Sequence, residues 1–258
     1  MQNNIFPGLY VGQNLIKLDR VSSTNDYLKE QLSNFKPLDE GSAIMTIDQY
    51  SGKGQRGNTW QSQPGKNLTI SIVFYPTFLA IEDQFLLNVC FSLGLTNWLQ
   101  STLRQSVKVK WPNDIMVDQQ KICGILIENQ VKKSSISSSI IGIGVNINQT
   151  NFGTELTQRV CSMKGMLGQE DDLSIDQLLP SLFQHLQMQY ELLKKGAHSE
   201  LLKAYNTTLM WQGELRPFLI DDVEVQGKIV EVRKDGLLHV DFGKAIRTFQ
   251  MKEISHKL

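Results

Sequence analysis

The feature that most constrains the fold is the frequent change of hydrophobic period along the chain. Short β-prone runs cover residues 43–49, 68–75, 107–111, 122–128 and 140–147. Segments of helical period alternate with them and cover residues 24–32, 82–103, 174–190 and 199–205. Strands and helices are therefore interspersed, and the chain is predicted to be a mixed α and β protein.

Three local features modify this prediction. Pro180 lies inside the fourth helical segment and is expected to break or kink it. The serine-rich residues 132–139 are predicted to form a hairpin loop. After residue 212 the chain consists of short β segments around a strong Asp235-Gly236 turn. We therefore expect two domains, residues 1–212 and residues 213–258, the second a small β-barrel or sandwich that docks on the first.

Composition excludes several classes of protein. Lys and Arg number 26, as do Asp and Glu, so the net charge is zero and any basic surface that binds anions must be local. Three dispersed cysteines suit a reducing compartment, and the four histidines show no metal-ligand spacing. The N-terminal residues lack the pattern of a signal peptide, and the apolar residues 85–103 are interrupted by polar residues. We expect a cytoplasmic protein that does not bind membranes.

Two familiar motifs lack the surrounding sequence that their usual functions require. Residues 52–57 match G-x-G-x-x-G after an expected strand, but a dinucleotide site needs the last glycine to open a helix. The residues that follow, NTWQSQPG, have no helical period and contain a Pro-Gly turn. Residues 241–243 read DFG, but no HRD loop precedes them and too few residues follow for a kinase.

Five polar clusters at the ends of apolar segments are more specific evidence of function. Each of the following clusters also has a purely structural explanation. The glycine loop could be a flexible turn, SSTN a helix cap, PND a hairpin, and Lys121 an edge lysine whose ammonium reaches solvent. Glycines in a core strand, by contrast, indicate close approach by a ligand or another backbone. In chain order the clusters are SSTN (22–25), DQYSGKGQRGNTW (48–60), VKWPND (109–114), KICGILIE (121–128) and GIGVNIN (142–148).

This ordered set resembles the catalytic domain of biotin protein ligases, also called biotin–acetyl-CoA-carboxylase ligases. The residues after about 213 resemble the small SH3-like barrel of that family. The resemblance implies an α+β fold, with a mixed, largely antiparallel sheet flanked by helices as in class II synthetase-like catalytic domains. It also implies a two-step activity. Biotin and MgATP form biotinyl-5′-AMP, and the biotinyl group then passes to a lysine of a carboxyl carrier domain of acetyl-CoA carboxylase or a related biotin-dependent carboxylase.

The family's site residues can be carried over by motif. Biotin is expected to contact Ser23, Thr24, Asn25, Gln49, Lys53, Gly54, Gln55, Lys121 and Gly124. ATP is expected to contact Lys53, Arg56, Trp60, Asn113, Lys121 and Asn146. Lys121 and Asp114 are the expected catalytic residues, and no fixed metal site is expected beyond Mg²⁺ that arrives with ATP. Asp114 either binds that metal or orients the acceptor amine. Trp60 either stacks on the ligand or packs in the core.

The chemistry explains why these residue types are needed. The ureido ring of biotin is neutral and rich in donors and acceptors, so its site needs hydroxyl and amide partners over an apolar floor. Adenylation brings a carboxylate against the α-phosphate, so cations must stand where negative charge gathers. Lys121 is the candidate beside both groups, helped by Lys53 or Arg56 and a metal ion. The glycine loop is predicted to close as a lid.

Two departures from the family pattern carry expectations of their own. The loop is commonly GRGRxGR, and here Lys53 replaces its first arginine and Gln55 its second, which leaves Gln55 and Arg56 as alternatives for the second role. About 20 residues precede SSTN, fewer than a winged-helix domain needs, so no DNA binding is expected.

A homodimer is an open possibility. The rival functions are a related ligase for lipoate or another small acid, and a non-catalytic carrier- or nucleic-acid-binding module.

Overall fold

The main structural element is a large sheet that is mostly antiparallel. The computed structural model describes residues 8–34, 38–153 and 159–257, with every side chain in them except those of Asn34 and Arg56. Seven strands of the described residues form this sheet, and in chain order they are β1 (Leu15–Val21), β2 (Ala43–Gln49), β5 (Leu68–Phe74), β6 (Val107–Lys110), β7 (Asp114–Val117), β8 (Gln120–Lys132) and β9 (Ser135–Val145). Their spatial order is β1-β2-β5-β9-β8-β7-β6. Only the β1–β2 pair is parallel within this sheet, so the predicted mixed, largely antiparallel sheet is confirmed.

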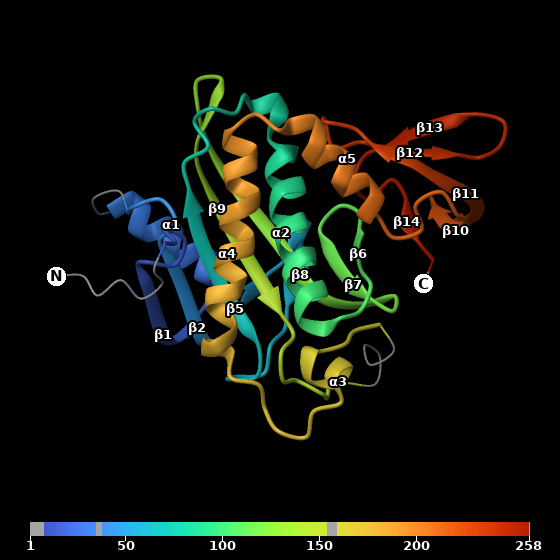
Figure 1. The fold of residues 1–258 in the computed structure, drawn as a ribbon. Helices are drawn as coiled ribbons and strands as arrows, with labels where there is room; N and C mark the ends of the chain where they lie inside the picture. Colours follow the sequence, from blue (N-terminus) through green and yellow to red (C-terminus); the bar gives the residue numbers. More distant parts are fainter. Residues whose placement is uncertain (1–7, 35–37, 154–158, 258) are drawn as a thin grey trace.

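Helices cover both faces of the sheet (Figure 1). The helices of the described residues are α1 (Thr24–Asn34), α2 (Phe85–Leu103), α3 (Met163–Leu167), α4 (Ile175–Lys194) and α5 (His198–Thr208), with the 3-10 turns η1 (Gln55–Gly57) and η2 (Ile81–Asp83). Ile72 and Phe74 of β5 join the main core with α2 and α4, whereas Val73 joins a second, smaller core with Leu28 of α1. Since neighbouring strand residues point to opposite faces, α1 lies on the face opposite α2 and α4.

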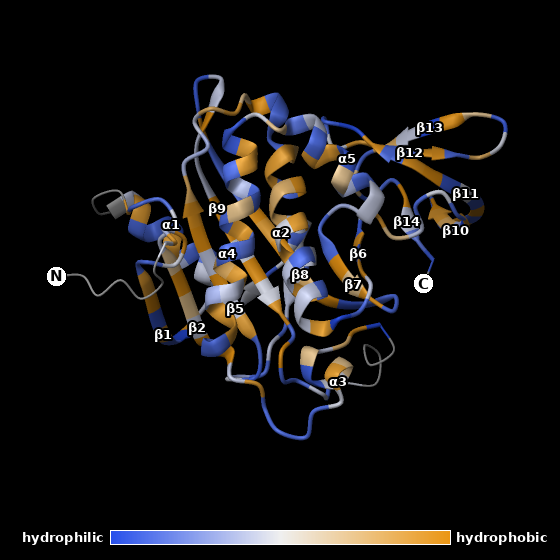
Figure 2. Ribbon diagram, viewed as in Figure 1, coloured by the Kyte–Doolittle hydropathy of each residue, from blue (hydrophilic) through white to orange (hydrophobic). Residues whose placement is uncertain are grey.

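The two long helices differ in how they are buried. Figure 2 shows hydrophobic residues along most of α2, whereas α4 carries hydrophilic stretches beside hydrophobic ones. Most residues of α2 are buried, as expected for a helix that packs between the sheet and two other helices. α4 is amphipathic and buries one side, which includes Phe183 and Tyr190.

The C-terminal residues form a separate antiparallel sheet beside α5. Its strands are β10 (Leu215–Ile220), β11 (Val223–Val232), β12 (Leu238–Asp241), β13 (Ile246–Phe249) and β14 (Ser255–His256), in the order β13-β12-β11-β10-β14. Gly236 takes a φ of +84° in the turn between β11 and β12, so the hairpin predicted from Asp235-Gly236 is confirmed. The Trp111 indole donates to the Gly236 carbonyl oxygen at 3.0 Å and ties this sheet to the end of β6.

Two local predictions need correction: the expected break at Pro180 is absent, and the hairpin expected at residues 132–139 is present with a shorter loop. α4 runs unbroken through Pro180, whose exposed position lets water reach the backbone carbonyl that loses its amide partner. The region 132–139 is mostly strand, because β8 and β9 stay paired as far as Lys132 and Ser135 and only residues 133–134 turn. Here pairing with a neighbouring strand outweighs the weak β-propensity of serine.

Candidate active site

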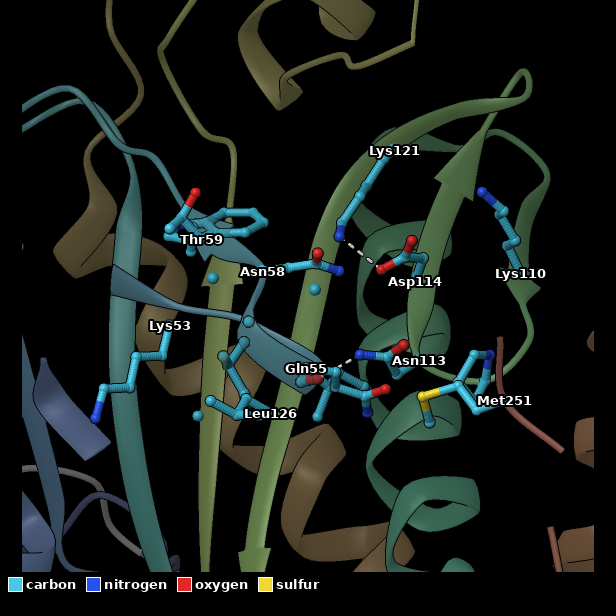
Figure 3. Close-up of a pocket in the computed structure, with 18 of the residues that line it drawn as sticks. Lys53, Gln55, Asn58, Thr59, Lys110, Asn113, Asp114, Lys121, Leu126 and Met251 are labelled. Carbon is cyan, nitrogen blue, oxygen red and sulfur yellow. Dashed lines mark hydrogen bonds and ion pairs between the residues drawn. The ribbon is translucent and has the colours of Figure 1, made fainter. Parts of the chain in front are cut away.

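The site lies on the face of the sheet that α1 covers only in part. A cavity of about 270 Å³ opens there, lined by residues of the sheet, of α1, of the glycine-rich hairpin and of the C-terminal sheet (Figure 3). The glycine-rich hairpin consists of β3 (Gly52–Lys53), η1 and β4 (Thr59–Trp60). The cavity thus gathers segments that are far apart in the sequence.

Glycines in β9 create room on the floor of the cavity. A Cβ on Gly142 would lie 2.3 Å from the Asn25 side-chain oxygen, and a Cβ on Gly144 would lie 2.4 Å from the Trp60 ring. Both contacts are shorter than real Cβ atoms allow. The sequence predicted close approach by a ligand or a backbone. In the structure two side chains of the site, Asn25 and Trp60, occupy this room.

A network of neutral groups forms one end of the cavity, which we call the amide end (Ser23, Thr24, Asn25 and Gln49, which line the cavity, with Ser71 buried behind them). The Thr24 backbone N–H donates to Gln49 Oε1 at 2.9 Å, and Ser71 Oγ lies 2.7 Å from Thr24 Oγ1 and 2.5 Å from Asn25 Oδ1. Asn25 Nδ2 donates to Glu128 at 2.8 Å. These contacts fix the amide end before any ligand arrives.

Ser23 serves the helix as well as the cavity. Its Oγ accepts a long hydrogen bond of 3.4 Å from the Asp26 backbone N–H, as an N-cap residue does, and the residue also lines the cavity. The capping interpretation and the ligand interpretation of SSTN are therefore compatible.

The glycine-rich hairpin covers the cavity from the solvent side. Gly52 must be glycine, because a Cβ there would lie 2.3 Å from the Trp60 carbonyl oxygen. Lys53 reaches back to α1, with Nζ 2.7 Å from an Asp26 oxygen, and this contact raises the pKa of the Lys53 ammonium. Gln55 and Asn58 line the cavity, whereas the side chain of Arg56 lies outside the described residues. The question of Gln55 or Arg56 stays open.

Lysine side chains dominate the opposite end of the cavity, which we call the lysine end (Lys110, Asp114 and Lys121). Lys121 Nζ lies 2.6 Å from Asp114 Oδ1, with side-chain exposures of 30% and 24%. Gly124 stands opposite Asp114 in the β7–β8 pair, and its missing side chain leaves space for the Lys121 amino group. The same amino group lies 5.6 Å from the centre of a Trp60 ring, within cation–π range.

The C-terminal sheet closes the lysine end. Met251, Ile254 and His256 line the cavity, although no sequence motif assigned them to it. Burial lowers the pKa of His256 to about 3, with the Lys110 charge as a second cause, so this imidazole is neutral at pH 7. Burial also lowers the pKa of Lys110.

Most residues predicted for the site line the cavity. They are Ser23, Thr24, Asn25, Gln49, Lys53, Gly54, Gln55, Trp60, Asn113, Asp114, Lys121 and Gly124. Asn146 is not among the lining residues, and its side-chain amide donates to the Cys161 carbonyl oxygen at 3.0 Å. Asn113 lines the cavity, but its Nδ2 donates to the Ile125 carbonyl oxygen at 2.6 Å, so that donor is already engaged.

The charges in this cavity are strongly unbalanced, although the whole chain is neutral. The described lining residues include four lysines, Lys53, Lys110, Lys121 and Lys252, but only one carboxylate, Asp114, and Asp26, which pairs with Lys53, lies outside the lining. Such a cavity attracts anions. The described part of the chain contains no cluster of three His, Cys, Asp or Glu side chains suited to a metal. None of its helices is both long and apolar enough to span a bilayer.

Comparisons with known proteins show which family and which fold the chain resembles. Residues 18–146 match the Biotin/lipoate A/B protein ligase family. The chain is 30% identical over 164 residues to the Bifunctional ligase/repressor BirA of Bacillus spizizenii, which is 63% of this chain and 50% of that protein. It is 30% identical over 132 residues to the Biotin--[acetyl-CoA-carboxylase] ligase of Paracoccus denitrificans, 50% of this chain and 53% of that protein. The chain thus matches about half the length of each relative.

The fold also matches a solved structure. A biotin protein ligase from Aquifex aeolicus, in complex with biotin and ATP, superimposes with a TM-score of 0.78. The match covers 95% of this chain and 98% of that chain at 24% identity, and at that identity it shows the fold alone.

Proposed function

The chain belongs to the Biotin/lipoate A/B protein ligase family, and from this we propose that it is an ATP-dependent biotin protein ligase. It condenses biotin with ATP to biotinyl-5′-AMP and transfers the biotinyl group to a lysine of a biotin carboxyl carrier domain. One observation carries the proposal: a single cavity joins an amide end, fitted to a neutral polar ring, to a lysine end, fitted to phosphates.

The amide end binds the ureido ring of biotin. Its hydroxyl and amide groups supply both donors and acceptors, and Leu126 and Ile143 supply apolar surface beside them. Trp60 Nε1 is buried and has no hydrogen-bond partner among the described residues, so the indole N–H is available to a ligand. A buried donor without a partner costs about 1–3 kcal/mol, which a bound acceptor would recover.

Adenylation takes place next to Lys121. The biotin carboxylate attacks the α-phosphorus of ATP, the bond from that phosphorus to the bridging oxygen breaks, and pyrophosphate leaves with the electron pair. The Lys121 ammonium draws the two anions together and stabilises the charge that develops on the phosphoryl oxygens. Its pairing with Asp114 holds the amino group at the reacting centre rather than in solvent.

Magnesium fits this arrangement as an ion that enters with ATP. Mg²⁺ is commonly held by one or two carboxylates together with substrate phosphates, and Asp114 is the single lining carboxylate among the described residues. Bound there, the ion would neutralise phosphate charge. Asp114 is also positioned to orient the acceptor amine in the second step, when the amine attacks the acyl carbonyl and AMP leaves.

The acceptor is a carrier domain of acetyl-CoA carboxylase or a related biotin-dependent carboxylase, which docks along an exposed edge of the sheet. The reaction is placed in the cytoplasm, where the three unpaired cysteines stay reduced. Homodimer formation and the absence of DNA binding stay predictions.

A single incubation tests the proposal. The protein is mixed with biotin, ATP labelled in the α-phosphate, Mg²⁺ and a biotin-acceptor domain, and the products are labelled AMP and one biotinylated lysine. Omission of the acceptor should leave a labelled adenylate. Titration calorimetry with biotin and with lipoate then separates the two acids, and tight binding of lipoate in preference to biotin would contradict the proposal.

A further inference from the structure

One cation of the cavity has no task in the proposed reaction. Lys110, the last residue of β6, lines the cavity and is half-buried, yet no ion pair found among the described residues includes it. The other two assigned lysines each have a carboxylate, Asp114 for Lys121 and Asp26 for Lys53. A half-buried ammonium without a counter-charge is costly, so its position calls for an anion.

The groups that face Lys110 leave its charge uncompensated. Asp114 stands opposite it across the β6–β7 turn, but that carboxylate is engaged by Lys121 at 2.6 Å. Lys121 and Arg159 add positive charge, and the Lys121 backbone N–H donates to the Arg159 carbonyl oxygen at 2.8 Å. His256, on the C-terminal side, is neutral. Burial and these two cations lower the pKa of Lys110, while Asp114 alone opposes them.

The position of Lys110 relates it to one part of the nucleotide. Figure 3 shows Lys53 and Lys110 on opposite sides of the cavity, with Lys121 and Asp114 between them. Lys53, of the glycine-rich hairpin, lies beside the amide end through its contact with Asp26 of α1, the residue after Asn25. In phosphoryl transfer the attacking and leaving groups stand roughly in line across the phosphorus. A carboxylate that comes from the amide end therefore expels its leaving group toward Lys110.

On the premise of the proposed function, we propose that Lys110 binds the departing pyrophosphate. The leaving group carries up to four negative charges when the bridging oxygen takes the electron pair, which is the charge that the lysine end lacks. Arg159, which is exposed and acts electrostatically on Lys110, adds a second cation. Lys110 is then a catalytic residue of the first step and has no part in the second, because pyrophosphate has left before the acceptor amine attacks.

The test separates the two steps. Lys110→Met keeps most of the side-chain volume and removes the charge. We expect it to raise the inhibition constant of pyrophosphate against adenylate formation about 10- to 100-fold, the range for loss of a charged hydrogen bond. Transfer from chemically prepared biotinyl-5′-AMP to the acceptor domain should be unchanged, and so should the affinity for biotin. Lys110→Arg should restore pyrophosphate binding.

Lys108 provides the matched control. It stands two residues earlier on β6, is exposed and lies outside the residues that line the cavity. Lys108→Met should leave both steps and the pyrophosphate inhibition constant unchanged. An unchanged inhibition constant in Lys110→Met, or an equal loss in both steps, would overturn the assignment of Lys110 alone. A wild-type protein that forms no adenylate would overturn the proposed function, and this inference with it.

Discussion

The two ends of the cavity are built on opposite electrostatic principles. At the amide end, Thr24 and Asn25 are almost fully buried, and their polar groups are bonded to Gln49, Ser71 and Glu128. At the lysine end, Lys110 and Lys121 are half-buried, and the one carboxylate there, Asp114, pairs with Lys121. The polar groups of the amide end are hydrogen-bonded within the protein, whereas the positive charge of the lysine end is balanced only when an anion binds.

This difference follows from what each end has to recognise. A neutral ring offers only hydrogen bonds, so its site gains selectivity from donors and acceptors that are already fixed in place. A phosphate offers charge, so its site gains affinity from cations that the protein itself does not neutralise. The division predicts that variants at the lysine end change rates, and that variants at the amide end change the affinity for biotin.

The largest effect is expected from Lys121→Ala. Loss of a charge-stabilising donor typically lowers a rate about 100- to 1000-fold, so adenylate formation should almost disappear while the fold is retained. Pyrophosphate release measures the rate, and thermal unfolding checks the fold. Lys66→Ala is the matched control, because Lys66 also pairs with an aspartate at 2.6 Å, that of Asp172, outside the cavity. A near-normal rate of pyrophosphate release in Lys121→Ala would contradict the division.

Gly144→Ala tests the amide end by adding a methyl group to the floor of the cavity. The added Cβ would lie 2.4 Å from the Trp60 ring, which lines the cavity and would have to move. Overpacking of this kind costs about 1–3 kcal/mol, and we expect a loss of that size in the free energy of biotin binding. Titration calorimetry measures it.

Gly165→Ala is the control for that substitution. A Cβ on Gly165 meets its nearest atom at 3.5 Å, an ordinary contact, in the short helix α3 away from the cavity. Biotin affinity should be unchanged in this variant. Unchanged affinity in Gly144→Ala as well would mean that Trp60 plays no part in the biotin site.

The sequence predicted the amide end more completely than the lysine end, for physical reasons. Strong local patterns fix α1 and β2, and the motif residues lie on these elements: Thr24 and Asn25 begin α1, and Gln49 ends β2. Ser71 was missed, although a hydroxyl in the middle of the apolar run 68–74 was a signal that could have found it. β1 was missed because its polar and apolar residues show no strand-like alternation and its pairing partner supplies the structure.

The lysine end depends on contacts that local patterns do not encode. Met251 and His256 reach the cavity because the C-terminal sheet docks against the end of β6, through a contact of Trp111 with Gly236 that joins residues 125 positions apart. Docking of that sheet was expected, but the identity of the docked residues depends on its orientation. Lys110 lay within a recognised motif, and only the structure places it without an ion pair among the described residues.

The pH dependence of stability tests whether His256, which lines the lysine end, is neutral in the folded protein. The pKa of His256 is about 3 in the folded protein and about 6.5 in an unfolded chain, so the unfolded state binds more protons between these values. Stability contributed by the neutral imidazole is therefore present above about pH 6.5 and is lost as the pH falls toward 3, by up to about 1.4 kcal/mol per pH unit. His256→Phe should remove this part of the slope.

Denaturant unfolding between pH 7 and pH 4 measures that slope. The phenyl ring can keep the packing of the imidazole on Trp211, whose ring centre lies 5.1 Å away. Equal slopes in His256→Phe and the wild type would show that folding does not change the proton affinity of this imidazole, which would contradict the lowered pKa of His256.

The smallest effect is expected where the amide end carries its own ion pair. Lys53 and Asp26 are 53% and 37% exposed, and exposed pairs contribute about 0–1 kcal/mol. Asp26→Asn should therefore lower the free energy of unfolding by less than about 1 kcal/mol, and the difference should shrink in high salt, where exposed charges are screened. Urea unfolding at low and high salt measures both. A loss of several kcal/mol that persists in high salt would mean that charge, rather than the neutral network, holds the glycine-rich hairpin to α1, and the contrast between the two ends would fail.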